Sequence, residues 1–340
     1  MPIRRLRIRP ETGPSSWRAA LAIAATLALL LALGLGSLCL GTPNLAPARL
    51  LDLTGDRLAA VLVGQVRLPR LAIAVVAGAG FAVAGLLLQE CLRNPLATPE
   101  LLGMGPGAAL VIATLVVFSA PVPLGWYPPL ALGGALLGGV LTLAVTRNAR
   151  TPTGVLLGGA AVGAALNALV VAVTSMAEQL QVQALFKYLS GSLAGMTWAQ
   201  AAPALAWAAL LLPLSVATLP WLAALRMGEQ TAASLGVPVT RARWLVLALA
   251  GTLVAACVSA TGPVAWIGFL APHIARWATP SASVAVWLPL AAVIGAVVTV
   301  AADLGARLWF APVETPVGAW TAVLGVVVAL FSIAAQRVSS

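Results

Sequence analysis

The chain has 340 residues, of which 61% are hydrophobic and only 8% are charged, and this composition argues against an ordinary soluble domain. A lipid bilayer accommodates such a chain, because apolar side chains there face hydrocarbon instead of water. The formal net charge of +10 is dispersed among hydrophobic runs, which favours an all-α, polytopic integral membrane protein over a partner of nucleic acid.

The first hydrophobic run predicts a retained membrane helix rather than a cleaved secretory signal. It spans residues 19–40 and follows a segment with five arginines between Arg4 and Arg18. The apolar core of a secretory signal is only about 7–15 residues long, whereas a crossing of the hydrocarbon needs about 20. This run is long enough to cross, so we expect it to be the first membrane helix.

Further hydrophobic runs of spanning length recur along the chain, bounded by charges, prolines or glycines. Together they predict about ten transmembrane helices in a single domain covering residues 1–340. We expect them at residues 18–40, 70–90, 100–120, 127–146, 154–176, 199–223, 244–260, 264–278, 284–306 and 317–336. Three connections are long enough to carry function, at residues 41–69, 178–197 and 226–243.

The distribution of basic residues predicts which side of the membrane each connection faces. With the amino terminus in the cytoplasm, the cytoplasmic segments hold 13 arginines. The outer segments then hold six basic residues, Arg49, Arg57, Arg67, Arg70, Lys187 and Arg307. Because cytoplasmic loops carry the excess of Lys and Arg, this split predicts that both termini are cytoplasmic.

The sequence lacks the motifs of an energy source or an active site. Its single lysine, Lys187, follows Phe186, so the GxxxxGK[ST] loop that binds ATP phosphates is absent. Glu90 and Asp303 lie close to predicted helix ends, whereas ion-coupled carriers usually need charged relays within the membrane. No GxSxG or HExxH motif and no metal-ligand spacing appears. We therefore predict a conduit, not an enzyme, with no catalytic residue, metal or cofactor of its own.

The segment of residues 226–243 is the strongest candidate for contact with a partner. It is polar and flanked by arginines, so it lies outside the hydrocarbon, on the cytoplasmic side by the charge count. Residues Glu229 to Leu235 predict a short helix, which Gly236 and Pro238 end. The pattern alone leaves two interpretations open, a plain connecting loop or a docking helix for a cytoplasmic protein.

Four other stretches carry distinctive motifs in a fixed order along the chain. They read RLPR at 67–70, QECLRNPLATPELLG at 89–103, GPVAWIGFLAPHIAR at 262–276 and ADLGARLWFAPVETPVGAWT at 302–321. The segment at 226–243 adds an E…A..LG.P pattern. Together the five stretches resemble the FecCD-type permeases of ABC importers (type II importers) for iron-siderophores, haem and cobalamin. One departure is Glu90, which stands where the family usually has a small residue.

The resemblance implies a transport complex in the inner (plasma) membrane of a bacterium. Members of the family have ten helices per subunit and pair as homodimers or pseudo-dimers, and the complete ten-helix unit favours a homodimer. Two separate ATPase subunits, which hold ATP and Mg, bind at the cytoplasmic face. A periplasmic substrate-binding protein delivers the cargo to the outer mouth of the path.

The resemblance also assigns three groups of site residues. It assigns ATPase coupling, within the cytoplasmic coupling segment 226–243, to Glu229, Ala233, Leu235, Gly236 and Pro238. It assigns docking of the binding protein to Arg67, Arg70 and Arg307, which taken alone read as interfacial anchors. It assigns a cytoplasmic gate to Asn94, Leu96, Thr151 and Thr153. Asn-Pro and Thr-Pro are also ordinary turn formers, and Pro152 departs from the family pattern.

These observations predict a permease that moves an iron chelate, haem or a ferric siderophore, from the periplasm to the cytoplasm. A cobalamin permease of the same family is the first alternative, because the cargo is not readable from the sequence. A secondary transporter driven by an ion gradient is the second, and the scarcity of charged relays disfavours it. A membrane-embedded enzyme is the third, and it lacks a nucleophile–base or metal cluster.

Overall fold

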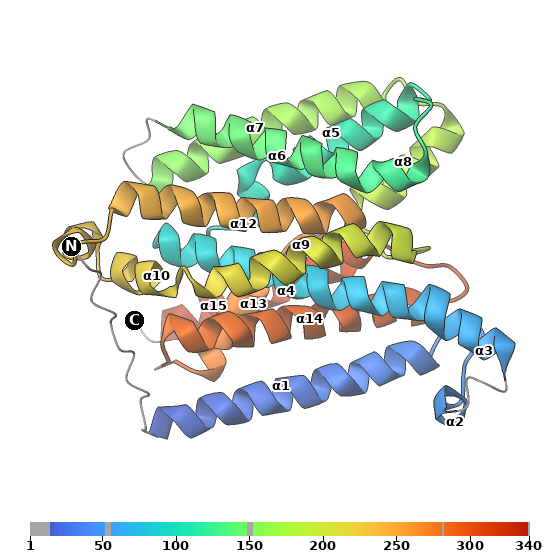
Figure 1. Ribbon diagram of the computed structural model, residues 1–340, viewed down its shortest axis with the longest axis horizontal. Coiled ribbons are helices and arrows are strands. Elements are labelled where there is room, and N and C mark those ends of the chain that lie inside the picture. Colours follow the sequence, from blue (N-terminus) through green and yellow to red (C-terminus); the bar gives the residue numbers. More distant parts are fainter. Residues whose placement is uncertain (1–13, 52–55, 148–151, 281, 339–340) are drawn as a thin grey trace.

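The computed structural model describes residues 14–51, 56–147, 152–280 and 282–338. Within these ranges the chain forms helices and no strand, and Figure 1 shows the long helices packed side by side along one direction. Seven of the described helices are long and apolar enough to cross a membrane, and shorter apolar helices follow at Met104–Val117 and Val317–Val328. The predicted all-α, polytopic membrane fold is confirmed.

The elements of the first half of the chain are α1 (Pro14–Cys39), α2 (Pro47–Leu51), α3 (Arg57–Val61), the π-helical turn η1 (Leu62–Arg67), α4 (Leu68–Cys91), the 3-10 turn η2 (Pro99–Leu102), α5 (Met104–Val117), the 3-10 turn η3 (Leu124–Trp126), α6 (Tyr127–Thr146) and α7 (Pro152–Thr174). In Figure 1, this half supplies α1 at one edge of the bundle, α5 to α7 at the opposite edge, and α4 between them.

The second half begins with a short helix and then returns across the bundle. Its elements are α8 (Gln179–Leu189), α9 (Trp198–Val216), α10 (Leu219–Arg226), α11 (Glu229–Ser234), α12 (Val239–Thr261), α13 (Ile267–Ala278), α14 (Val284–Leu308) and α15 (Val317–Val338). In Figure 1, α2, α3 and α8 lie at one end of the bundle, which we call the α2 end. α10 and the following α11 lie at the opposite end, with the start of α1 and the end of α15, and we call it the α11 end.

The second membrane helix starts earlier than predicted, and the prediction of residues 70–90 is corrected here. α3, η1 and α4 form one continuous helix that starts at Arg57. Asp56 caps this start, because its carboxylate accepts a hydrogen bond of 3.0 Å from the backbone N–H of Ala59. Pro69 does not end the helix, because it follows a π-helical turn. In that turn the regular α-helical hydrogen bonds, which a proline cannot make, are already replaced.

Two segments between the remaining crossings also differ from the prediction. The crossing predicted at residues 199–223 is divided into α9 and α10, with Pro220 in the first turn of α10. Near this break the hydroxyl groups of Ser215 and Thr218 bond to main-chain carbonyls of the preceding turn, a pattern that often bends helices. The outer connection predicted at residues 178–197 contains α8. The remaining predicted crossings correspond to helices in the predicted order, although α13 at the predicted crossing of 264–278 has only 12 residues and is not among the candidate spans.

α4 forms the centre of the bundle, because every residue from Ala77 to Cys91 is buried. Two glycines allow its neighbours to approach closely. A Cβ atom on Gly78 would collide with the backbone of Gly295 in α14, and one on Gly85 would collide with the backbone of Gly268 in α13. The end of α4 therefore has a fixed position relative to both helices, and this end forms one wall of the site described next.

Candidate functional site

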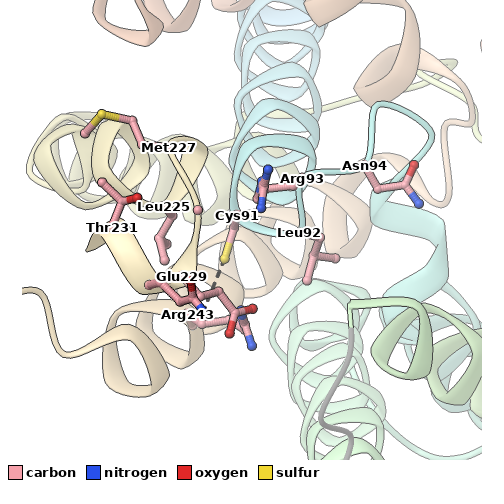
Figure 2. A pocket seen from close by; sticks show the side chains of 11 residues that line it. Cys91, Leu92, Arg93, Asn94, Leu225, Met227, Glu229, Thr231 and Arg243 are labelled. Carbon is pink, nitrogen blue, oxygen red and sulfur yellow. Dashed lines mark hydrogen bonds and ion pairs between the residues drawn. The ribbon is translucent and has the colours of Figure 1, made fainter. Parts of the chain in front are cut away.

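A polar pocket of about 600 Å³ opens at the α11 end, between the end of α4 and the segment that joins α10 to α11. Figure 2 shows Arg93 on one side of the pocket, with Glu229 and Arg243 together on another. Three separate parts of the chain line it, with Cys91 to Asn94 from the end of α4, Leu225 and residues 227–231 around α11, and Arg243 from α12. The pocket brings the predicted coupling segment next to the predicted gate residue Asn94.

The coupling segment forms the short helix that the sequence predicts, α11, which has six residues. Two glycines with positive φ allow the chain to reverse on either side of it, Gly228 at +115° and Gly236 at +81°. Ala232 is fully buried and attaches α11 to the bundle, whereas the side chain of Leu235 is 57% exposed. The helix is therefore held at a fixed place and presents an apolar side chain outward.

The other predicted coupling residues lie on the same turn. Glu229 begins α11, and its carboxylate accepts a hydrogen bond from the guanidinium group of Arg243 in α12. This ion pair closes the turn between α11 and α12. Ala233 is exposed on α11, and Pro238 is exposed directly before α12. All five predicted coupling residues thus belong to one surface turn beside the pocket.

The predicted gate residues are only partly described by the structure. Asn94 lies in the turn after α4, and its side-chain oxygen accepts a hydrogen bond of 2.9 Å from the backbone N–H of Leu96. This is the Asx turn that an Asn-Pro sequence favours. Leu96 itself is 66% exposed. Thr151 lies outside the described residues, and Thr153 lies in α7 with its side chain outside the description, so the gate stays a prediction.

Behind the pocket, Glu90 forms an ionic cluster that the sequence did not predict. Glu90 is 7% exposed, and its carboxylate lies 3.4 Å from Arg276 of α13 and 3.7 Å from Arg226 of α10. Arg276 also donates a hydrogen bond of 2.9 Å to the side chain of Gln89. The guanidinium group of Arg226 lies 4.4 Å from the ring centroid of Trp287 in α14. The cluster joins α4, α10, α13 and α14 immediately before α11.

The α2 end holds a second ionic cluster, which includes two of the predicted docking arginines. Arg70 donates a hydrogen bond of 2.9 Å to Asp303 and lies 3.0 Å from Glu314. Arg307 lies 3.3 Å from the other oxygen of Asp303 and donates a hydrogen bond of 2.8 Å to the hydroxyl of Ser37. The side chains of Asp303, Arg70 and Arg307 are 1%, 8% and 8% exposed. The cluster therefore connects α1, α4 and α14 inside the protein.

The third predicted docking residue, Arg67, is also turned inward. It is 5% exposed, and its guanidinium group donates hydrogen bonds to three main-chain carbonyls. Two belong to Leu38 and Cys39 at the end of α1, and the third belongs to Pro43 in the segment after it. The structure thus brings the three predicted docking arginines together, but it directs their donors to groups of the same chain. Their contact with a binding protein stays a prediction, and sequence reasoning missed the internal partners.

The comparisons with known proteins agree with this architecture. The FecCD transport family matches residues 29–334. The chain belongs to the FecCD transport family. The Fe(3+)-citrate import system permease protein YfmE of Bacillus subtilis is 33% identical over 308 residues, which cover 90% of each chain. The vitamin B12 import system permease protein BtuC of Vibrio cholerae is 36% identical and covers 78% of this chain and 80% of the relative.

A solved structure shows that the likeness extends to the three-dimensional arrangement. It is described as an inward-facing conformation of a metal-chelate type ABC transporter, and it matches this FecCD chain with a TM-score of 0.82 at 25% sequence identity. The match covers 94% of this chain and 99% of the other. The predicted FecCD-type permease is confirmed, and the family match spans both ionic clusters and the α11 pocket.

Proposed function

We propose that this FecCD family chain is the permease of an ATP-driven importer and that α11 receives a separate ATPase subunit. The geometry of α11 carries the proposal. It is a short helix held between two glycine turns, with Leu235 exposed at its end and a polar pocket of about 600 Å³ beside it. A helix that combines an exposed apolar side chain at one end with a polar pocket at the other fits the mixed chemistry of a protein–protein contact.

The α11 end faces the cytoplasm in this proposal. Exposed arginines gather there, namely Arg18, Arg93, Arg147, Arg226 and Arg241. At the α2 end, by contrast, exposed arginines among the described residues are limited to Arg49 and Arg57. Since basic residues accumulate on the cytoplasmic side of membrane proteins, both termini and α11 are cytoplasmic in the bacterial inner membrane.

The complete importer in this proposal contains two copies of the chain and two ATPase subunits, which bind ATP and Mg. A periplasmic binding protein docks on the α2 end. For Arg67, Arg70 and Arg307 to take part directly, acidic groups of the binding protein must compete with acceptors of this chain. Glu314, whose side chain is 40% exposed, is the internal partner of Arg70 that such a competitor displaces most easily.

The proposed cargo is an iron chelate, either a ferric siderophore or haem. Similar proteins whose names state an iron chelate include the Fe(3+)-citrate permease and the iron(3+)-hydroxamate permease FhuG of Bacillus subtilis, which is 32% identical. Cobalamin is the alternative, supported by the vitamin B12 permease of Vibrio cholerae. Uptake of radiolabelled ferric citrate, ferric hydroxamate, haem and cobalamin into vesicles that hold the complete importer distinguishes them, and uptake of cobalamin alone would overturn the iron assignment.

Loss of the ATPase from the complex tests the role of α11. We expect the double substitution Leu235→Asp and Gly236→Asp to prevent co-purification of the ATPase with the membrane subunit. The substitution removes the exposed apolar contact and places a side chain at a φ of +81°. Ser283→Asp is the matched control, because it adds a charge at the N-cap of α14, where aspartate is favoured. A complex that survives the double substitution intact would show that α11 is only a connection.

A further inference from the structure

The pocket beside α11 contains more positive than negative charge. Among its lining residues the charged ones are Arg93, Arg243 and Glu229, which sum to a net charge of +1. Glu229 pairs with Arg243, so the excess belongs to Arg93. The remaining lining is partly polar, with Asn94 and Thr231 among its residues. The pocket is therefore built to favour an anionic group.

Arg93 is the charged group that faces the pocket without an internal counter-charge. It is exposed and has no hydrogen bond or ion pair among the described residues. Its guanidinium group lies beside α11, because a Cβ on Gly228 would be 3.8 Å from its Nη1 atom. On the other side of the pocket, the Nε of Arg243 is buried and lacks a hydrogen-bond acceptor, although the same guanidinium group holds Glu229. Arg93 is therefore the arginine of this pocket whose donors are both exposed and unpaired among the described residues.

We propose that a carboxylate side chain of the ATPase subunit enters this pocket and pairs with Arg93. This inference rests on the proposed function, because it requires the ATPase to dock at α11. The guanidinium group presents paired N–H donors that match a carboxylate, so the bond also orients the two proteins. A volume of about 600 Å³ exceeds the space of one side chain, so the carboxylate arrives on a loop or helix end that occupies the rest.

The chemistry of the pocket favours a protein carboxylate over a phospholipid headgroup. A bound lipid also needs apolar surface for its acyl chains next to the phosphate. Here the lining is mixed, with Glu229, Gln230 and Thr231 of α11 beside the apolar Leu92, Leu225 and Met227, as is usual at a protein–protein contact. α11 is also the element that the proposed ATPase contacts, so docking at α11 already places the ATPase next to the pocket.

A zero-length cross-link tests the proposed pair in the assembled complex. The substitution Arg93→Lys keeps the charge and provides an amine, which a carbodiimide joins to a carboxylate in direct contact. The native chain offers one lysine, Lys187 in α8 at the α2 end, so background from other lysine side chains of this chain is confined to the far side. Arg241→Lys is the matched control, because Arg241 is exposed at the same end but does not line the pocket.

We expect a covalent product between Arg93→Lys and an Asp or Glu of the ATPase, located by mass spectrometry, and little product from Arg241→Lys. In a separate titration, Arg93→Ala should weaken binding of the ATPase by about 30-fold or more, the effect of removing one partner of a charge pair buried at an interface. The loss should appear mainly as faster dissociation.

Three results would overturn the inference. The first is an assembled complex in which Arg93→Lys gives no product with the ATPase and Arg93→Ala binds normally. The second is a product that forms only within this chain, between the new amine and Glu229. The third is an anionic phospholipid that co-purifies with the native chain and is lost from Arg93→Ala. If the native chain binds no ATPase at all, the proposed function itself fails, and this outcome is distinct from the other three.

Discussion

The arginines of the ionic cluster at the α2 end and Arg93 in the pocket at the α11 end are used in opposite ways. At the α2 end, Arg70 and Arg307 are buried and share the carboxylate of Asp303, and Arg70 also pairs with Glu314, so two carboxylates of the chain balance their charges. At the α11 end, Arg93 is exposed beside a pocket and has no such partner among the described residues. Arg70 and Arg307 therefore stabilise the fold, whereas Arg93 is available to a partner protein. Burial and the neighbouring acids, not the residue type, decide between the two roles.

The largest effect on stability is expected from Asp303→Asn. The substitution leaves the buried Arg307 without a counter-charge and Arg70 with only the partly exposed Glu314. Breaking a buried ion pair in this way costs about 3–5 kcal/mol. Thermal unfolding of the purified protein in nanodiscs measures it. Asp56→Asn is the control at the same end, because Asp56 pairs with Arg49 at the surface and asparagine also caps a helix. Equal losses for the two variants would contradict the distinction between buried and exposed charges.

Glu90→Gln should have an intermediate effect. It removes the negative charge between Arg226 and Arg276, but Gln89 and Trp287 keep contacts with the arginines. We expect a loss of about 1–3 kcal/mol, the usual penalty for a buried polar group that loses its partner. The same thermal measurement applies. A stability equal to that of the native chain would show that the cluster before α11 contributes nothing to holding α10 in place.

A smaller effect is expected from Glu314→Gln. Its side chain is 40% exposed, and Arg70 keeps its bond to the buried Asp303, so the loss of stability should stay below about 1 kcal/mol. If acidic groups of the binding protein compete for Arg70, this variant should also bind that protein more tightly. Surface plasmon resonance against the binding protein checks this, and weaker binding would assign Glu314 itself to the docking surface.

The smallest effect on stability is expected from Arg93→Ala, within about 0.5 kcal/mol, because no described group depends on this side chain. This variant separates binding from stability, because its effect should appear in binding of the ATPase and not in thermal unfolding. A thermal shift as large as that of Asp303→Asn would mean that Arg93 supports the fold, contrary to the proposed difference between the two ends.

The order of the helices and the position of α11 could be predicted from the sequence. Membrane crossings follow from long apolar runs, because a bilayer requires each span to satisfy its own backbone hydrogen bonds. The end of α11 could be predicted because Gly236 adopts a positive φ and Pro238 cannot continue a helix. Both effects are local, so they can be read from the sequence. The start of the second crossing was missed because Arg57, Gln65 and Arg67 interrupt the apolar run and Pro69 looks like a boundary.

The two ionic clusters could not be predicted from local pattern. Arg70 and Asp303 are 233 residues apart in the chain, and Gln89 and Arg276 are 187 apart. Only the packing of α4 against α13 and α14 brings them together. The arginine motifs indicated which residues carry charge, but the acids that neutralise them lie on helices whose relative rotation is set by close contacts such as Gly78 with Gly295. For this reason the sequence pointed to docking and the structure shows internal pairing.

Uptake by proteoliposomes distinguishes an ATP-driven permease from an ion-coupled carrier. The permease is reconstituted with its ATPase, and the binding protein loaded with a radiolabelled ferric chelate is added on the side of the α2 end. We expect accumulation that requires ATP on the side of α11 and is abolished by the double substitution Leu235→Asp and Gly236→Asp. Accumulation that continues without ATP and follows an imposed proton or sodium gradient would contradict it and identify a secondary transporter.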